Sequence, residues 1–554
     1  MPLFFVSRFF AILKCEPTKN FYSIINMRVA RSVIFVLLFC GLLTSKGAGQ
    51  TETRPTPALE TWVAVSKQTL QSLTAKIAER LARPEVRRGQ VGVKIVSLNT
   101  GQIIFQQNAE KYFMPASNMK NFTVSTALEK LTPDFRFVTS VFASSAPDAT
   151  GTVNGIRVFG RGDISISDTF NDGDKYKGLD KLADAIAAAG VKRIEGDIIG
   201  DETYFTGSPV SGSWEWDDLQ FYYGAEVSAL PLNDNAQSVS VIPGPVGYPC
   251  SVKFTPFNPI VRITNLCTTT PAGTPRTLRI DKKIDRNIVE ITGTLPAGNA
   301  GFSGFVSVSR PAELFVALLK QRLEAKGITV TGQTRAVNTK MLVPADMNLE
   351  IAKLESPPLS VIAARTMKPS QNMYTETLLW TLGEYARART SYPTVGVGGV
   401  AVSGKNADSA ELGIGEVKSF LTSIGVSPDG IIQHDGSGLS RHDLITPEAV
   451  VQLYTYMGKQ SRYSQAWRDS LTIGGVDGTL RSRFTGTKAA GNVRGKTGTI
   501  DQVSALSGYV TTASGEQLVF SMVVNGVNET RTRTSLLDDI VVYLANFDGS
   551  ADQQ

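Results

Sequence analysis

About 250 residues separate two short motifs that suit one chemical site. Ser117-Asn118-Met119-Lys120 stands early in the chain, Ser370-Gln371-Asn372 stands much later, and Lys496-Thr497-Gly498 follows near the carboxyl end. Connections of more than about 15 residues without structure of their own are uncommon within a compact domain. The spacing therefore predicts that one or two further domains are inserted between the first and second motifs of a catalytic domain.

The first motif suits acyl transfer. A serine and a lysine three positions apart lie one turn apart on a helix, so their hydroxyl and amine can share a proton. The pattern from Asn118 to Leu131 is helical, which predicts Ser117 at a helix amino terminus, where unpaired N–H groups favour developing negative charge. Ser117 is a candidate nucleophile and Lys120 a candidate base. The competing interpretation, a serine that merely caps the helix after Pro115, is weakened by the presence of the other motifs.

The other two motifs also fall on suitable elements. Ser370-Gln371-Asn372 lies between helical patterns at 358–367 and 373–386, and Lys496-Thr497-Gly498-Thr499 precedes strand patterns. Glycine after Lys496-Thr497 lets a substrate backbone approach a strand. Each motif alone has an ordinary alternative, a turn or an exposed lysine, and a Ser-x-x-Lys match arises by chance about two or three times in such a chain. Their order and placement carry the argument.

Composition and pattern divide the chain further. The region from Phe135 to about Leu342 is rich in strand patterns, with helices expected at Lys177–Ala189 and Pro311–Lys326. The last strands and helix suggest a terminal sheet packed by the first and last helices. We expect a signal region at 1–49, a linker at 50–57, the catalytic domain at 58–134 and 346–549, one or two inserted domains at 135–345, and a tail at 550–554.

The net charge of +6 is concentrated before Gln50, where six basic residues stand against one acidic residue. Arg28 and Arg31 precede an apolar run from Ser32 to Leu43, which is typical of a secretory signal. A start at Met27 is equally compatible with this pattern, and small residues near 47–49 suit cleavage, which predicts a periplasmic protein. A retained membrane anchor is the alternative, for which the run is short. The nearly neutral remainder gives no ground for nucleic-acid binding.

Two cysteines, Cys250 and Cys267, remain after removal of such a signal. An even pair in an exported protein makes them a candidate disulfide, with two buried thiols as the alternative.

The ordered motifs resemble those of the penicillin-recognising serine acyltransferases. The long insertion, with Trp214-Glu215-Trp216-Asp217, Tyr222-Tyr223-Gly224-Ala225 and the segment His434–Arg441, is similar to low-molecular-mass penicillin-binding proteins of the D-alanyl-D-alanine carboxypeptidase and endopeptidase type, the peptidase S13 family. This resemblance covers about 58–547. It implies an α+β serine β-lactamase/DD-peptidase fold, an antiparallel sheet flanked by helices, with one or two mixed α/β domains inserted. Gln371 departs from the pattern of the wider superfamily, which bears on selectivity more than on activity.

The resemblance also implies roles for the site residues. Ser117 would attack the carbonyl between two D-alanines of a peptidoglycan stem peptide, and Lys120 would accept its proton. Ser370 would relay that proton, Asn372 would bind the substrate amide, and Lys496 would lower the pKa of Lys120. The substrate-binding strand is formed by Thr497, Gly498 and Thr499, whose two threonines would bind the terminal carboxylate. The resemblance implies β-lactam antibiotics as inhibitors, and neither a metal nor a cofactor.

Other interpretations remain open at this point. A β-lactamase shares the chemistry but has a much shorter gap between its first two motifs, and a wall-binding protein without turnover would not need intact motifs. His434 and His442 allow a Ser-His-Asp interpretation, although no G-x-S-x-G elbow surrounds either. Trp214 and Trp216 suit either core packing or stacking on sugars.

Overall fold

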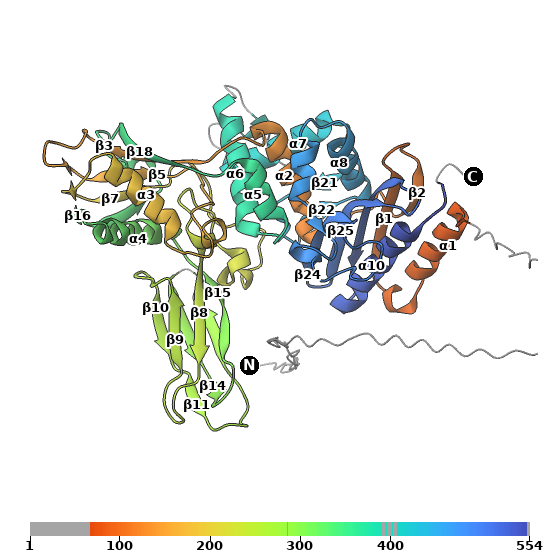
Figure 1. Ribbon diagram of the computed structural model, residues 1–554, viewed down its shortest axis with the longest axis horizontal. Coiled ribbons are helices and arrows are strands. Elements are labelled where there is room, and N and C mark those ends of the chain that lie inside the picture. Colours follow the sequence, from red (N-terminus) through yellow and green to blue (C-terminus); the bar gives the residue numbers. More distant parts are fainter. Residues whose placement is uncertain (1–66, 285, 390–393, 396–400, 403–406, 551–554) are drawn as a thin grey trace, which may run out of the picture. The chain divides into compact units, whose positions relative to one another are not determined.

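The computed structural model describes residues 67–284, 286–389, 394–395, 401–402 and 407–550 (Figure 1). Outside these residues lie the expected signal region, the expected linker and the first residues of the expected catalytic domain. The first helix that is described is α1 (Leu70–Leu81). Thr69 caps it by accepting a hydrogen bond from the backbone N–H of Ser72.

A six-stranded antiparallel sheet joins the beginning and the end of the described chain (Figure 1). Its order is β2-β1-β26-β25-β24-β23, so β1, near the beginning of the described chain, pairs with β26 from the last part of the sequence. The strands are β1 (Gln90–Ser97), β2 (Ile103–Gln107), β23 (Thr472–Ile473), β24 (Arg494–Ile500), β25 (Val503–Thr511) and β26 (Gln517–Asn525).

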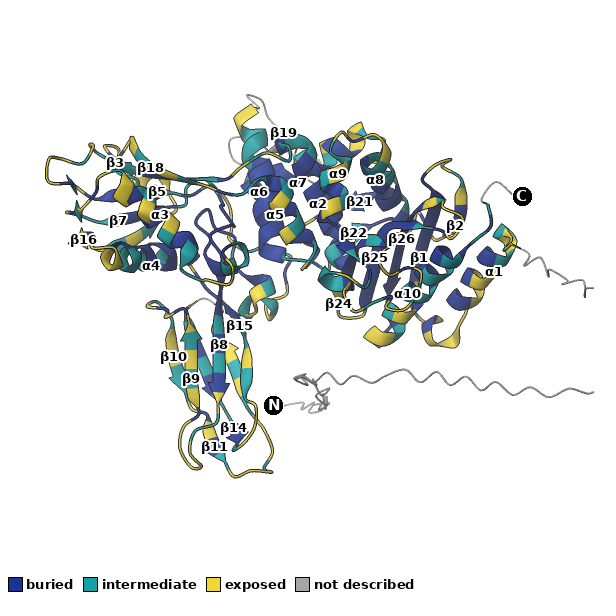
Figure 2. Ribbon diagram, in the orientation of Figure 1, coloured by how far each residue is buried: buried dark blue, intermediate teal, exposed yellow. Residues whose placement is uncertain are grey.

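Helices cover both faces of this sheet, and the central strands are buried almost throughout (Figure 2). Successive side chains of a strand point to opposite faces. Leu506 and Val510 of β25 accordingly join one apolar cluster with α1 and α10 (Thr530–Asn546), whereas Ala505 and Tyr509 join another. The first and last described helices thus pack on the terminal sheet, as the sequence pattern predicts.

The second apolar cluster is built by a group of helices around α2 (Lys120–Leu131). Residues 120–128 of α2 are all buried, so this helix has no solvent face in its first two turns. The surrounding elements are α5 (Leu359–Met367), α6 (Asn372–Arg389), α7 (Ser409–Ser423), α8 (Pro447–Lys459), α9 (Ser464–Ser470) and the short pair β21 (Ile431–Ile432) and β22 (Leu444–Ile445); β19 (Thr394–Val395) pairs with β20 (Ala401–Val402).

The inserted region has a mixed α/β part. Its five-stranded sheet has the order β17-β7-β5-β3-β18, a three-stranded sheet has the order β16-β6-β4, and two helices bury their apolar faces against this part. The elements are β3 (Val138–Ala143), β4 (Thr152–Val153), β5 (Ile156–Phe159), α3 (Lys177–Ala188), β6 (Arg193–Ile194), β7 (Ile198–Asp201), α4 (Pro311–Ala325), β16 (Thr329–Val330), β17 (Thr334–Val337) and β18 (Leu349–Glu355).

A second, all-β part of the insertion lies between β7 and α4 in the sequence. Cys250 and Cys267 form a disulfide within its small apolar core. Its strands are β8 (Ala236–Ile242), β9 (Ser251–Thr255), β10 (Arg262–Asn265), β11 (Thr268–Thr270), β12 (Arg279–Lys282), β13 (Ile288–Thr292), β14 (Thr294–Pro296) and β15 (Phe302–Ser307).

β18 (Leu349–Glu355) follows residue 345, where we expect the second catalytic segment to begin. It pairs antiparallel with β3 from Leu349–Ala143 to Glu355–Val138. The chain therefore completes the sheet of the insertion before it returns to the catalytic domain at α5. No sequence pattern indicates this pairing, because register between distant strands is not encoded locally.

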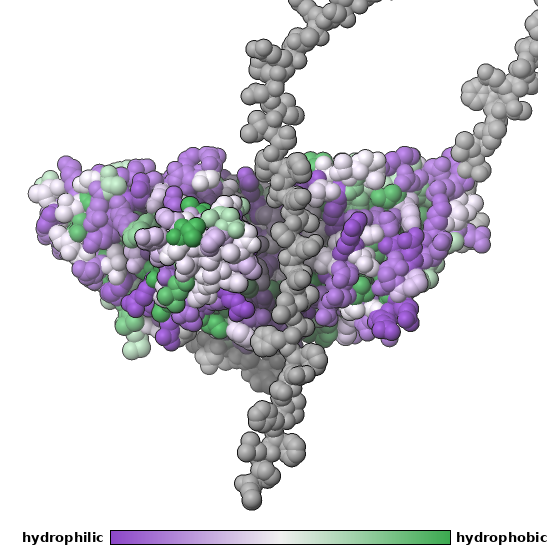
Figure 3. Space-filling model, turned by 90° about the horizontal axis from the view of Figure 1, so that it is seen from below, coloured by the Kyte–Doolittle hydropathy of each residue, from purple (hydrophilic) through white to green (hydrophobic). Residues whose placement is uncertain are grey.

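Apolar side chains on the surface are dispersed. On the face that Figure 3 shows, hydrophobic residues form small separate groups among hydrophilic ones. Within the described ranges, none of the helices has both the length and the apolar character needed to cross a bilayer.

Two glycines let α6 and α7 approach until their backbones almost touch. A Cβ atom on Gly383 would lie 1.9 Å from the carbonyl oxygen of Ser409, and one on Gly413 would lie 2.1 Å from that of Leu379. Because both obstacles are backbone atoms, neither can turn aside. This contact fixes the distance between the helix that carries Asn372 and its neighbour.

Gly383→Ala should therefore destabilise the protein, although alanine favours helix formation. We expect a loss of about 1–3 kcal/mol from overpacking, measured by denaturant unfolding. Gly415→Ala is the matched control, since Gly415 lies in α7 with no atom near its Cβ position. That variant should gain about 0.5–1 kcal/mol. Equal effects of the two substitutions would contradict the close-contact interpretation.

Candidate active site

The three motifs meet in one cleft of about 700 Å³. Ser117, Ser370, Asn372, Thr497 and Thr499 all line it, although the sequence separates them widely. The expected insertion does not interrupt this arrangement, because the chain leaves the catalytic domain after α2 and returns at α5, beside it.

Ser117 lies within a short 3-10 helix, η2 (Ala116–Met119), which leads directly into α2. Its Oγ is 3.0 Å from Nζ of Lys120. The preceding residue, Ala116, has a positive φ of 46°, a conformation that a residue with a side chain seldom adopts. The expected start of a helix is present, and the turn before it aims the serine hydroxyl at the lysine amine.

Lys120 is completely buried, with two oxygen acceptors in addition to Ser117. Its Nζ donates to Oδ1 of Asn372 at 2.6 Å and to the carbonyl oxygen of Ser437 at 2.7 Å. These oxygens can only accept, so a neutral amine would use both N–H groups on them. Its lone pair is then left for the hydroxyl of Ser117.

Burial lowers the pKa of Lys120 to about 8, although the carboxylates of Asp435, Glu376 and Asp443 act in the opposite direction. Desolvation disfavours the charged form of an amine. A lysine with this pKa is a usable base near neutral pH.

Ser370 and Lys496 form a second hydrogen-bonded pair at the cleft. Nζ of Lys496 donates to Oγ of Ser370 at 2.8 Å and to the carbonyl oxygen of Thr497 at 2.8 Å. Burial, and then repulsion by Lys120, hold the pKa of Lys496 well below its usual value. Ser370 itself has a φ of 65°, so the second motif stands in a strained turn between α5 and α6.

The third motif lies on β24, close to Ser117. A Cβ on Gly498 would be 2.5 Å from the carbonyl oxygen of Pro115 and 3.1 Å from the backbone nitrogen of Ser117. Within the described residues, β23 pairs only with Arg494 and Gly495, so the edge of β24 beyond them is open to the cleft. Glycine is therefore needed to bring this edge against the turn that holds Ser117.

Asp435 shapes the loop at 436–440, within the segment His434–Arg441 that carries part of the family resemblance. One carboxylate oxygen accepts from the backbone N–H groups of Ser437 at 3.0 Å and Gly438 at 2.6 Å. The other accepts from the N–H of Ser440 and from Nε1 of Trp214, each at 2.8 Å. Asp435 thus holds the loop whose Ser437 carbonyl contacts Lys120.

Glu376 supports the same loop from α6. Its carboxyl oxygens accept from the N–H of Gly436 at 2.9 and 3.0 Å. Burial raises the pKa of Glu376 to about 8. Sequence reasoning missed Glu376 and the capping role of Asp435, since a buried acid and an exposed one look alike in sequence; the Gly-Ser-Gly run after Asp435 was the available sign.

The second motif also contacts the insertion. Nδ2 of Asn372 donates to the carbonyl oxygen of Tyr223 at 2.9 Å. Nε2 of Gln371 donates to Oδ2 of Asp234 at 3.1 Å. Gln371 does not line the cleft, so the residue that departs from the superfamily pattern faces the insertion instead of the substrate.

The alternative site residues lie elsewhere. The rings of His434 and His442 are 5.7 Å apart and neither lines the cleft, which removes the basis for a Ser-His-Asp site there. Trp214 is buried, whereas Trp216 is exposed. In the part of the chain that the structure describes, no group of three or more His, Cys, Asp or Glu is arranged to hold a metal ion.

Comparison with known proteins agrees with this geometry. Residues 73–547 match the model of the D-Ala-D-Ala carboxypeptidase 3 (S13) family. The chain belongs to this family. A D-alanyl-D-alanine carboxypeptidase of Actinomadura sp. (strain R39) is 34% identical over 493 residues, covering 87% of this chain and 86% of the relative. D-alanyl-D-alanine carboxypeptidase DacB of Haemophilus influenzae is 26% identical over 455 residues, covering 79% and 85%.

The fold of the S13 family is confirmed as well. The crystal structure of penicillin binding protein 4 (dacB) from Haemophilus influenzae superposes with a TM-score of 0.70 at 23% identity, covering 85% of this chain and 98% of that one. The predicted family and the predicted α+β serine β-lactamase/DD-peptidase fold are therefore both correct.

Proposed function

We propose that this S13 protein is a periplasmic serine D-alanyl-D-alanine carboxypeptidase and endopeptidase, which cleaves peptidoglycan stem peptides through an acyl-enzyme on Ser117. The observation that carries the proposal is that two sets of hydrogen-bonded motif residues meet at one cleft. Ser117 contacts Lys120, Lys120 contacts Asn372, and Ser370 contacts Lys496, all within 3.0 Å.

Acylation follows from these contacts. Oγ of Ser117 attacks the carbonyl carbon between two D-alanines while its proton passes to Nζ of Lys120. Backbone N–H groups of Ser117 and Thr499 would stabilise the oxyanion, a large electrostatic contribution in acyl transfer. The C–N bond then breaks, the proton passes through Ser370 to the leaving amine, and water later releases the stem peptide from Ser117.

Substrate binding uses the open edge of β24. An extended peptide can pair with an exposed strand edge, and Thr497 and Thr499 would bind the terminal carboxylate of the last D-alanine. Lys496 beside them adds positive potential. A β-lactam presents a carboxylate and a strained amide in the same arrangement, which makes penicillin the expected inhibitor.

Benzylpenicillin therefore tests the nucleophile. The purified protein should gain the mass of one drug molecule, peptide mapping should place it on Ser117, and Ser117→Ala should abolish it. No adduct with the drug intact would favour a wall-binding protein, and no adduct with the drug consumed would favour a β-lactamase. Release of D-alanine from a pentapeptide, compared with cleavage of a cross-linked dimer, would separate the two peptidase activities.

The pH dependence of acylation tests the base. Only neutral Lys120 can accept the serine proton, so the rate should rise about tenfold per pH unit below the pKa and level off above it, with a midpoint near pH 8. Since the negative charge of Glu376 raises the pKa of Lys120, Glu376→Gln should move the midpoint to lower pH. A rate independent of pH through this range would refute Lys120 as the base.

Export is the remaining part of the proposal. The basic and apolar segment before Gln50 supports it, and the disulfide Cys250–Cys267 is compatible with an oxidising compartment. Cell fractionation should recover the protein from the periplasm with an amino terminus near 47–50. Recovery from washed membranes with an intact amino terminus would show a retained anchor instead.

A further inference from the structure

A strained turn of the insertion contacts the second motif. Asn233, Asp234 and Asn235 have φ angles of 46°, 62° and 51°, three consecutive left-handed residues without a glycine. Each such residue costs roughly 1–3 kcal/mol and persists only where its surroundings hold it. Each of its three side chains makes hydrogen bonds to its surroundings.

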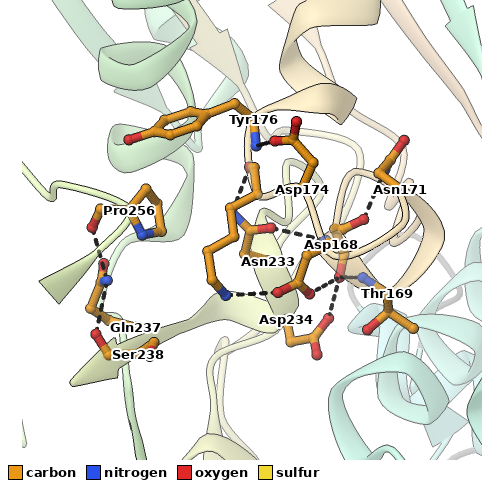
Figure 4. A network of polar contacts seen from close by, with 12 residues as sticks. Asp168, Thr169, Asn171, Asp174, Tyr176, Asn233, Asp234, Gln237, Ser238 and Pro256 are labelled. Atoms are coloured by element: carbon orange, nitrogen blue, oxygen red, sulfur yellow. Dashed lines mark hydrogen bonds and ion pairs between the residues drawn. The ribbon is translucent and has the colours of Figure 1, made fainter. Parts of the chain in front are cut away.

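The two asparagines fix the turn within the insertion. Oδ1 of Asn235 accepts from the N–H of Leu232 at 2.9 Å, and its Nδ2 donates to the carbonyl oxygen of Glu226 at 2.8 Å. Asn233 accepts from the N–H of Asp168 at 3.1 Å and donates to the carbonyl oxygen of Lys175 at 3.0 Å (Figure 4). Their side chains anchor the turn on both sides, so Asp234 is presented at a fixed position.

Asp234 meets donors from both sides of the boundary. Its Oδ1 accepts from Oγ of Ser167 at 2.8 Å and from the hydroxyl of Tyr374. Its Oδ2 accepts from Nε2 of Gln371 at 3.1 Å. An ionised carboxylate is an acceptor only, so this set of donors suits it, even though burial raises the pKa of Asp234 above its usual value.

The two catalytic-domain donors flank the catalytic asparagine. Gln371 precedes Asn372 directly, and Tyr374 lies in the same first turn of α6. The residue before them, Ser370, has the strained φ of 65° that directs its hydroxyl to Lys496. A carboxylate that holds positions 371 and 374 therefore limits rotation of the turn that presents both Ser370 and Asn372.

We infer that Asp234 is a positioning residue, through which the insertion holds the second motif in its reactive conformation by way of Gln371 and Tyr374. The insertion is then part of the catalytic apparatus. This inference rests on the proposed acyl transfer at Ser117. It also accounts for Gln371, whose amide is used to bind the insertion.

Asp234→Ala removes the acceptor for all three donors. We expect the maximal rate of acylation by benzylpenicillin to fall roughly 10- to 100-fold, the usual effect of a small misplacement, with a smaller change in the drug concentration at half-maximal rate. Asp234→Asn should recover part of the loss, because the unpartnered Oε1 of Gln371 can accept from the new amide if the Gln371 side chain turns over.

Asp168→Ala is the matched control. Asp168 belongs to the same polar network (Figure 4) and pairs with Lys175 at 2.7 Å, but among the described residues its carboxylate makes no hydrogen bond with the second motif. This variant should acylate as the wild type does. Tyr374→Phe, within the catalytic domain, should lower the acylation rate while thermal unfolding shows an intact fold, which keeps the inference testable if Asp234→Ala does not fold.

The outcomes are separable. If the wild type is not acylated, the proposed function fails. If the wild type is acylated and Asp234→Ala reacts like Asp168→Ala, the inference fails. It fails equally if rates fall only in proportion to melting temperature without recovery in Asp234→Asn, since that pattern indicates a structural role alone.

Discussion

The buried amine of Lys120 is the constraint on which the rest of the site depends. An ammonium group without water is costly unless its hydrogen bonds are replaced. Here the replacements come from two elements far apart in the sequence, the side chain of Asn372 and the carbonyl of Ser437. Any shift of α6 or of the loop at 436–440 would leave this amine unsatisfied, so the lysine that we propose as the base also holds the elements around it in place.

The two acceptors of Lys120 are themselves held by further hydrogen bonds. Asp435 holds the loop that contains Ser437, and it also accepts from Trp214 of the insertion. Asn372 likewise donates to the carbonyl of Tyr223. Both oxygens that hold Lys120 are thus supported by groups from the inserted region. The insertion therefore helps to position the residues that bind the buried amine.

The sequence predicted the catalytic motifs because their chemistry is local. A serine and a lysine one helical turn apart, and a glycine after Lys496-Thr497, can be recognised without knowledge of the fold, and the strand patterns near the carboxyl end indicated the terminal sheet. No sequence pattern identified Asp234 or Glu376 as part of the site. Their importance arises from burial and from donors 60 and 137 residues away, and no local pattern distinguishes them from surface acids. The pairing of β18 with β3 was not predicted for the same reason, since it joins strands about 200 residues apart.

The pairing of β1 with β26 determines which parts of the chain can fold first during synthesis. β1 is made early, whereas its partner emerges about 400 residues later, and long-range pairings of this kind form slowly. The strands of the insertion pair among themselves and need not wait. Ser117 and Lys120 are therefore already in the nascent chain long before β24 and β26 can complete the sheet beside them, and a reactive hydroxyl is assembled only once the ribosome has delivered nearly the whole polypeptide.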